Sequence, residues 1–173
     1  TEVKAVWYPG AEGGVTFSFR CEEPATAAMK EGVMGDPWGQ DNTEIFLDVS
    51  GSGDGHFYQI VTDGTGRYFT PTDGIGWKPK GLKTGVHIGN GEWSMEVFVP
   101  FADLMGFPKV QLPTTSANGV TWTGNFNRWR VGDMKLPKEQ RAEGSKNDWS
   151  RLFTRGNFWN KDPAAFGKLM FVE

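Results

Sequence analysis

One stretch of the sequence combines an aromatic side chain with two carboxylates at strand spacing. Trp38 lies next to a glycine, and Glu44 and Asp48 follow it within a run that alternates apolar and polar residues. Carboxylates accept strong hydrogen bonds, and a flat indole can cover an apolar surface. Taken alone, the two acids could bind a polar ligand, act as a catalytic pair or hold calcium. This stretch is therefore the first candidate for a functional site.

The residues from 44 to 49 predict the strand that positions these acids. Successive side chains of a strand point to opposite faces, so one face is apolar and the other carries acids beside a phenylalanine: Ile45, Leu47 and Val49 against Glu44, Phe46 and Asp48. A polar loop separates this strand from a second one at residues 57–62, and the simplest arrangement is an antiparallel hairpin. If Tyr58 and Ile60 join the core, Gln59 shares the face of the acids.

Composition and turn signals predict an all-β fold. The sequence has 24 glycines, 10 prolines, 8 tryptophans and 13 phenylalanines. Many turns that join short aromatic-rich strands are typical of a β-sandwich or barrel. Further strands are expected at 3–8, 15–21, 85–88, 92–99, 120–131 and 168–172, with helical turns within 23–37 and at 101–105. Residues 132–166 are expected to be a long, charged and largely structureless stretch that holds Trp149 and Trp159.

Length and charge limit the classes of function. With 173 residues the chain fits one domain over 1–173, and because it starts without Met we expect it to be excised from or attached to a larger protein. A net charge of -3, from 18 basic and 21 acidic residues, argues against a nucleic-acid or anionic membrane partner. No apolar run approaches the roughly 20 residues that span a bilayer, and the first residues, Thr1 to Lys4, lack the charged and apolar regions of a signal peptide. The single cysteine, Cys21, is expected to be a small core residue.

The ordered set of motifs resembles carbohydrate-binding module family 9. The matching elements are Trp38 with Asp41 to Asp48, Phe57 to Ile60, Trp93 to Phe101 with Leu104, Asn125 to Arg128, Trp149, and Phe166 with Gly167. They cover nearly the whole chain in the right order. The resemblance implies a two-sheet antiparallel β-sandwich, immunoglobulin-like or jelly-roll-like, with long loops and at most short helical turns. Such sandwiches are related to the DOMON sandwiches and are usually appended to secreted polysaccharide-degrading enzymes.

The resemblance also implies a site. In well-understood members two tryptophans clamp a terminal sugar, while a glutamate, an arginine and amides bind its hydroxyls. Here Trp38 matches one clamp tryptophan, and Glu44 matches the glutamate six residues on. The second clamp tryptophan falls in the long loop, where Trp149 and Trp159 are alternatives, with Trp77 a further one. The implied location is extracellular or at the cell surface, beside a linked catalytic domain, and the implied domain is non-catalytic and needs no cofactor.

A sugar explains why these residue types belong together. A pyranose has an apolar C–H face that an aromatic ring can cover and a rim of hydroxyls that polar side chains can bind. The ligand class is thus a mono-, oligo- or polysaccharide, and the candidate hydroxyl-binding residues are Glu44, Asp48, Gln59, Asn125, Asn127 and Arg128. The strand that carries Gln59 has glutamine and valine where such members have arginine and asparagine, so the site is altered at this strand.

Other interpretations remain open. A haem-binding electron-transfer domain on the DOMON sandwich would use His56, His87 or methionines as axial ligands. A glycosidase would need two carboxylates about 5–9 Å apart, which Glu44, Asp48 and Glu96 could supply. A degenerate module would act as a structural or interaction domain, in which Glu44 and Arg128 could simply form an ion pair. The Asp- and Gly-rich loops could hold structural calcium, although none has EF-hand spacing.

Overall fold

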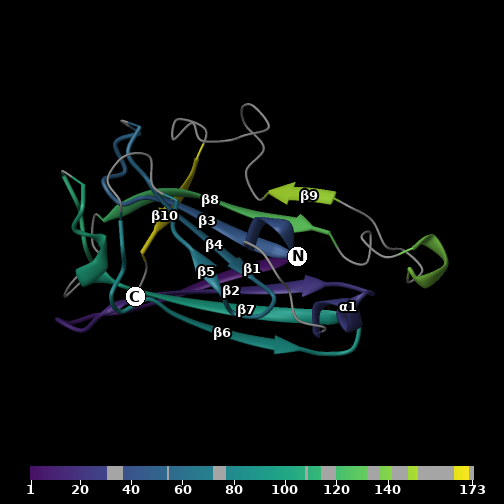
Figure 1. Cartoon of the computed structure of the whole chain (residues 1–173). Helices are drawn as coiled ribbons and strands as arrows, with labels where there is room; N and C mark the ends of the chain where they lie inside the picture. The colour runs from purple at the N-terminus through teal and green to yellow at the C-terminus, as the bar shows by residue number, and fades with distance from the viewer. Residues whose placement is uncertain are drawn as a thin grey trace.

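Two antiparallel β-sheets face each other in the computed structural model (Figure 1). The structure describes residues 1–30, 37–53, 55–71, 77–107, 109–113, 120–131, 137–141, 148–151 and 166–171. The strands are β1 (Glu2–Tyr8), β2 (Gly14–Glu22), β3 (Asn42–Asp48), β4 (Tyr58–Asp63), β5 (Tyr68–Phe69), β6 (Lys83–Ile88), β7 (Glu92–Pro100), β8 (Thr121–Arg130), β9 (Asp148–Arg151) and β10 (Gly167–Met170). Helical segments are short: α1 (Thr26–Lys30) and the 3-10 turns η1 (Pro37–Gly39), η2 (Phe101–Leu104) and η3 (Lys138–Gln140). The predicted all-β sandwich is confirmed.

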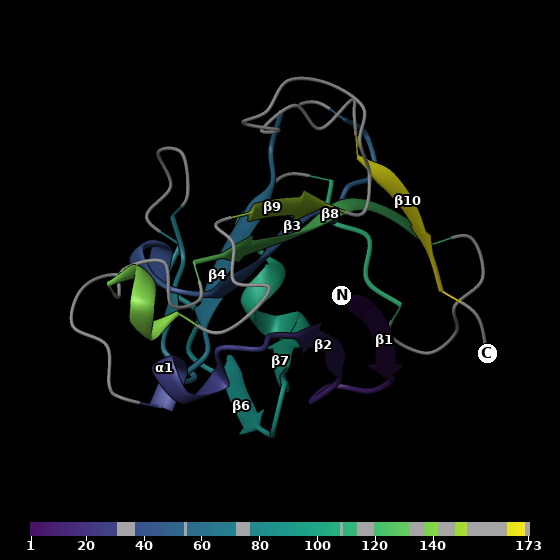
Figure 2. The same ribbon diagram turned by 90° about the vertical axis from the view of Figure 1, so that its right-hand side faces the viewer.

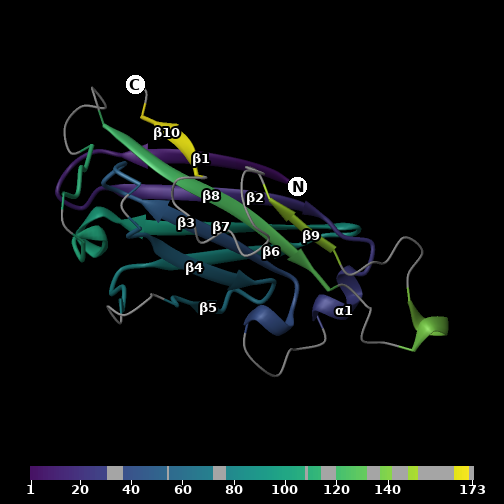
Figure 3. The same ribbon diagram turned by 90° about the horizontal axis from the view of Figure 1, so that it is seen from above.

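The strand order places β3 in the middle of one layer. The four-stranded sheet runs β1-β2-β7-β6, and the six-stranded sheet runs β10-β8-β3-β4-β5, with β9 pairing with β8. Figure 3 shows the six-stranded sheet lying over the other one, and Figure 2 shows the two layers end-on, with β1 and β10 on the same side. Both β9 and β10 pair with β8 on the side away from β3, at different heights. The structure therefore forms a short strand, β9, inside the stretch expected to be structureless.

The core lies between the sheets and follows the predicted alternation. Inward-facing residues come from both layers and include Phe17, Phe19, Ile45, Leu47, Tyr58, Ile60, Trp93, Met95, Val97, Val99, Trp122 and Phe126. Cys21 is buried as a free thiol, and burial raises its pKa although the charge of Arg128 partly opposes this. Burial also raises the pKa of Tyr58, whose hydroxyl accepts a hydrogen bond of 2.7 Å from the backbone N–H of Gly106.

The β3–β4 hairpin has the register in which Tyr58 and Ile60 join the core. Ile45 lies opposite Ile60, and Leu47 lies opposite Tyr58, so these four residues enter the core together. Because a slip of one residue would reverse every side chain, this register sends Gln59 to the outer face. The outer face of the six-stranded sheet thus carries Glu44 and Asp48.

One buried ion cluster joins the two sheets. Glu23, fully buried just after β2, accepts hydrogen bonds from Arg130 (Nε to Oε2, 2.7 Å, and Nη2 to Oε1, 3.2 Å) and from Arg128 (Nη2 to Oε2, 3.2 Å). The backbone N–H of Ala25 donates to the same carboxylate at 3.0 Å. Because the cluster links a residue beside β2 to two residues of β8, it ties the layers together at one end.

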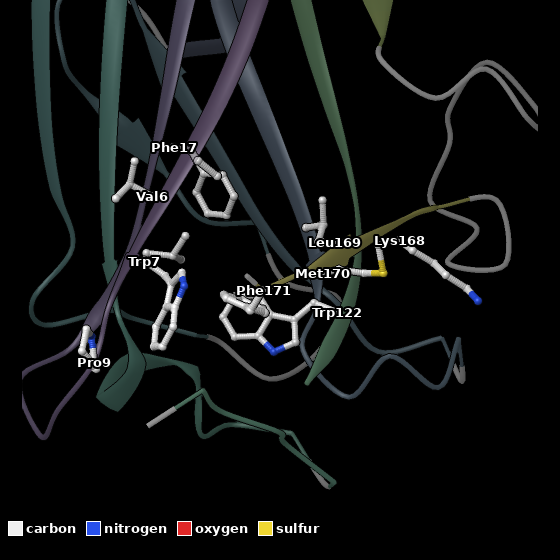
Figure 4. Close-up of a pocket in the computed structure, with 11 residues that line it drawn as sticks. Val6, Trp7, Pro9, Phe17, Trp122, Lys168, Leu169, Met170 and Phe171 are labelled. Atoms are coloured by element: carbon white, nitrogen blue, oxygen red, sulfur yellow. The ribbon is translucent and has the colours of Figure 1, made fainter. Parts of the chain in front are cut away.

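The two long edges of the sandwich differ. On the β5–β6 side, the hydroxyl of Thr84 donates to the carbonyl of Gly66 at 2.6 Å and so joins the layers. On the β1–β10 side lies an apolar cavity of about 670 Å³. In Figure 4, Trp7 and Trp122 lie on its two sides, and the side chain of Lys168 extends away from it. No helix within the described ranges is long and apolar enough to cross a membrane.

Candidate functional site

Cross-strand register gathers the candidate residues on the outer face of the six-stranded sheet. Glu44 and Phe46 point outward because Ile45 and Leu47 between and beside them point into the core. Two rows cross β4, β3 and β8 on this face: Val61, Glu44 and Asn127, and next to them Gln59, Phe46 and Asn125. We call Glu44, Gln59, Asn125 and Asn127 the polar group. It brings one carboxylate and three amides together on three adjacent strands.

The polar group is nearly enclosed and incompletely hydrogen-bonded. Glu44, Gln59 and Asn127 are 4%, 3% and 2% exposed. The amide Nδ2 of Asn127 donates to Oε2 of Glu44 at 3.5 Å, whereas Oδ1 of Asn127 and Oε1 of Gln59 accept no hydrogen bond in the described part of the chain. A buried acceptor left without a donor costs about 1–3 kcal/mol, and native structures keep few of them. Two such acceptors, on the two strands that flank β3, suit a ligand that brings donors.

An aromatic cluster adjoins the polar group. Phe46 packs against Phe57 and Phe166, with ring centroids 5.8 and 6.0 Å away, and the latter two rings are 5.8 Å apart. These three residues form a second buried cluster, separate from the core between the sheets. The outer face therefore offers hydrogen-bonding groups beside apolar surface.

The loop that carries Trp38 is tied to the start of β3. The side-chain amide of Asn42 donates to the carbonyls of Pro37 and Gln40 at 3.1 and 3.0 Å. Asn42 occurs two residues before Glu44 on the same face of β3. The backbone of Trp38, in η1, is thereby held close to the end of β3 from which Glu44 projects.

The candidates for the second clamp tryptophan lie in different parts of the chain. Trp149 lies on β9, where its backbone is directly opposite Trp129 of β8. Trp159 lies outside the described residues. Trp77, the third alternative, is buried in the core, where its ring packs against Tyr58 at 4.6 Å and its Nε1 donates to the carbonyl of Asp103 at 2.7 Å. The geometry gives Trp77 a structural role.

Asp48 lies on the predicted face but is occupied by its own loop. Its Oδ1 accepts from the backbone N–H and hydroxyl of Ser50 and from the N–H of Gly51, at 2.9, 2.6 and 3.1 Å. Its Oδ2 accepts from the N–H of Gly53 at 2.8 Å and from the hydroxyl of Thr123 at 3.4 Å. Because both oxygens are engaged and the residue is 1% exposed, Asp48 organises the β3–β4 loop and is not brought into the polar group.

The structure also separates Arg128 from the other candidates. It lies opposite Thr43, so it faces inward, where it pairs with Glu23. The expected joint role with Asn125 and the suggested ion pair with Glu44 do not fit this register, because neighbouring residues of a strand point to opposite faces. The residue that does join Glu44 is Asn127, and the alternation along β8 is the signal that identifies it.

Catalytic, haem and metal arrangements gain no support from the positions of their candidates. Glu96 is exposed on β7 in the other sheet and Asp48 is occupied, so neither forms a carboxylate pair with Glu44. His56 and His87 are exposed and belong to different parts of the fold, one before β4 and the other on β6. Among the described residues, no three His, Cys, Asp or Glu side chains gather as a metal site would require.

The cavity at the β1–β10 edge does not suit a polar ligand. Its walls are mainly apolar residues such as Val6, Trp7, Trp122, Leu169 and Phe171. The indole N–H of Trp122 already donates to the carbonyl of Gln111 at 2.6 Å. Hydroxyl-rich ligands need convergent polar groups, which among the described residues gather instead around Glu44.

Comparison with solved structures agrees with this architecture. The structure is similar to a carbohydrate binding module family 9 from Caldicellulosiruptor kristjanssonii in complex with glucose, with a TM-score of 0.59 and 15% identity over 98% of this chain and 77% of that chain. It is similar to the same kind of module in complex with cellotriose, with a TM-score of 0.60 and 14% identity over 98% and 75% of the two chains. No family model and no curated protein matches the sequence. The likeness confirms the fold that the sequence resemblance implies.

Proposed function

We propose that this domain binds a sugar without catalysing its conversion, through the outer face of the six-stranded sheet. The observation that carries the proposal is the pair of buried acceptors, Oε1 of Gln59 and Oδ1 of Asn127, beside the carboxylate of Glu44. Hydroxyls of a sugar would donate to these oxygens and remove the cost of leaving them unbonded. The solved structures with a similar fold contain glucose and cellotriose, which supports a saccharide as the ligand class.

Aromatic residues supply the apolar part of the proposed site. Trp38 lies in η1, on the loop that enters β3. Trp149 lies on β9, which pairs with β8. We propose that their indoles cover the C–H faces of the sugar. From the resemblance to carbohydrate-binding module family 9, we also propose that the domain is the binding module of a larger, extracellular protein that degrades polysaccharides.

Isothermal titration calorimetry with a sugar panel tests the proposal. The panel should include glucose, xylose, mannose and galactose with their linear trisaccharides. We expect Glu44→Gln to weaken binding at least tenfold, since it removes a charged acceptor worth about 1.5–3 kcal/mol. Glu96→Gln is the matched control because Glu96 also stands beside a phenylalanine on a strand, but in the other sheet and exposed. A wild-type protein that binds no member of the panel contradicts the proposal.

A second variant separates binding from folding. Gln59→Met keeps the length of the side chain and removes the acceptor that has no hydrogen bond. We expect this variant to be at least as stable as wild type in urea and to lose sugar affinity, which is the usual trade-off where polar groups are kept for function. Lower stability with unchanged affinity would assign Gln59 to the fold instead.

Because the polar group is nearly enclosed, a sugar reaches it only after a change in the conformation of the protein. Association that depends on such a change is slower than simple encounter. Tryptophan fluorescence in a stopped-flow instrument should therefore give an observed rate that reaches a plateau as the sugar concentration rises.

A further inference from the structure

An exposed aromatic residue lies on the same face, two strands from Glu44. Phe69 of β5 is opposite Val61 of β4, and Val61 is opposite Glu44 of β3. Residues that are opposite one another share a face of the sheet, so Phe69, Val61 and Glu44 form one row. Phe69 is 43% exposed, whereas Val61 and Glu44 are buried.

The spacing of this row suits a ligand longer than one sugar ring. Neighbouring strands are about 4.8 Å apart, so the backbone positions of Glu44 and Phe69 are about 10 Å apart across the sheet. A disaccharide spans such a distance, whereas one pyranose held at Glu44 does not extend across the two intervening strand spacings. An exposed ring beyond a polar group is also the type of surface on which the next sugar unit can stack.

The geometry points to Phe69 as the platform for a second sugar unit, so that the site takes a chain that runs across the strands from Glu44 toward β5. This inference rests on the proposed sugar site and specifies its ligand as an oligosaccharide. In the six-stranded sheet β5 is the last strand on this side (Figure 3).

Tyr68 provides a matched control on the same short strand. It is 42% exposed, almost the same as Phe69, but it lies opposite Thr62, on the other face of the sheet. Phe69→Ala and Tyr68→Ala therefore remove similar exposed aromatic surface from neighbouring residues, and only the first removes it from the side of Glu44.

The test is calorimetric titration of wild type and both variants with each monosaccharide and trisaccharide of the panel. We expect wild type to bind one trisaccharide about tenfold more tightly than its monosaccharide, and Phe69→Ala to abolish that difference while monosaccharide affinity stays unchanged. Tyr68→Ala should keep the difference. Equal loss in both variants, or a Phe69→Ala protein that keeps the difference, overturns the inference while the sugar site stands. Absence of binding by wild type overturns both.

Discussion

Glu23→Gln is the substitution for which the structure makes the sharpest stability prediction. The variant removes the carboxylate charge that pairs with Arg128 and Arg130. The side chains of these arginines are 7% and 12% exposed, and that of Glu23 is fully buried. The amide can still accept from the N–H of Ala25, but the guanidinium groups lose their ionic partner. Breaking a buried pair by removing one partner costs about 3–5 kcal/mol.

The expected loss is large relative to the stability of a typical domain. A net stability of about 5–15 kcal/mol is usual, so Glu23→Gln would remove a substantial part of it. With a urea dependence of about 2 kcal/mol per molar, a loss of 3 kcal/mol lowers the unfolding midpoint by about 1.5 M. Circular dichroism during urea titration at neutral pH measures this shift directly.

The exposed pair of Arg20 and Glu92 is the matched control. It also joins a glutamate to an arginine, at 2.6 Å, but the two side chains are 63% and 42% exposed. Exposed pairs contribute little because water and salt screen them, so Glu92→Gln should unfold near the wild-type midpoint. If Glu23→Gln shifts the midpoint no more than Glu92→Gln does, the argument that the buried cluster joins the sheets is refuted.

Two further predictions concern the loop after β3 and alkaline pH. Asp48→Asn should lower the free energy of unfolding by about 2 kcal/mol, because it weakens charge-assisted hydrogen bonds to Ser50, Gly51 and Gly53. It should leave sugar affinity within a factor of about two of wild type. A variant that loses affinity at full stability would assign Asp48 to the binding site. Burial raises the pKa of Cys21 and of Tyr58, so the unfolded chain releases these protons at lower pH than the folded one. The free energy of unfolding should therefore be unchanged below pH about 8.5 and fall as pH rises through about 10. The urea midpoints of Cys21→Ala and Tyr58→Phe should decline less steeply across this range than that of wild type. A decline as steep as that of wild type in both variants contradicts the assignment.

The strand pattern predicts the fold well because alternation records burial directly. The runs at 15–21, 45–49 and 93–99 each place apolar residues on one face, and all three enter the core between the sheets. The sequence leaves the hairpin register open, and the structure has the one that puts Tyr58 and Ile60 in the core. In contrast, β9 has only four residues, with no apolar alternation, so nothing in its sequence distinguishes it from the surrounding charged stretch.

The site is predicted less completely because the type of a residue does not determine on which face of its strand it lies. Glu44 and Gln59 reach the expected face, and Asn125 joins them there. Arg128 was included for its chemistry, although alternation along β8 assigns it to the face opposite Asn127. Alternation places Asp48 outward but says nothing of the turn that uses its oxygens. The partner of Arg128, Glu23, is far away in the sequence, and no local pattern reveals such a pairing.

The alternation along β8 also limits how this domain can change over generations. Asn125 and Asn127 serve the outer face, while Phe126 and Arg128 between and beside them serve the core and the ion cluster. Substitutions on the outer face can alter ligand preference without touching the interior. A deletion of one residue within β8 would instead exchange the two sets, sending amides into the core and an arginine outward. New specificities in such a domain are therefore reached by point substitution, and length changes are confined to the loops.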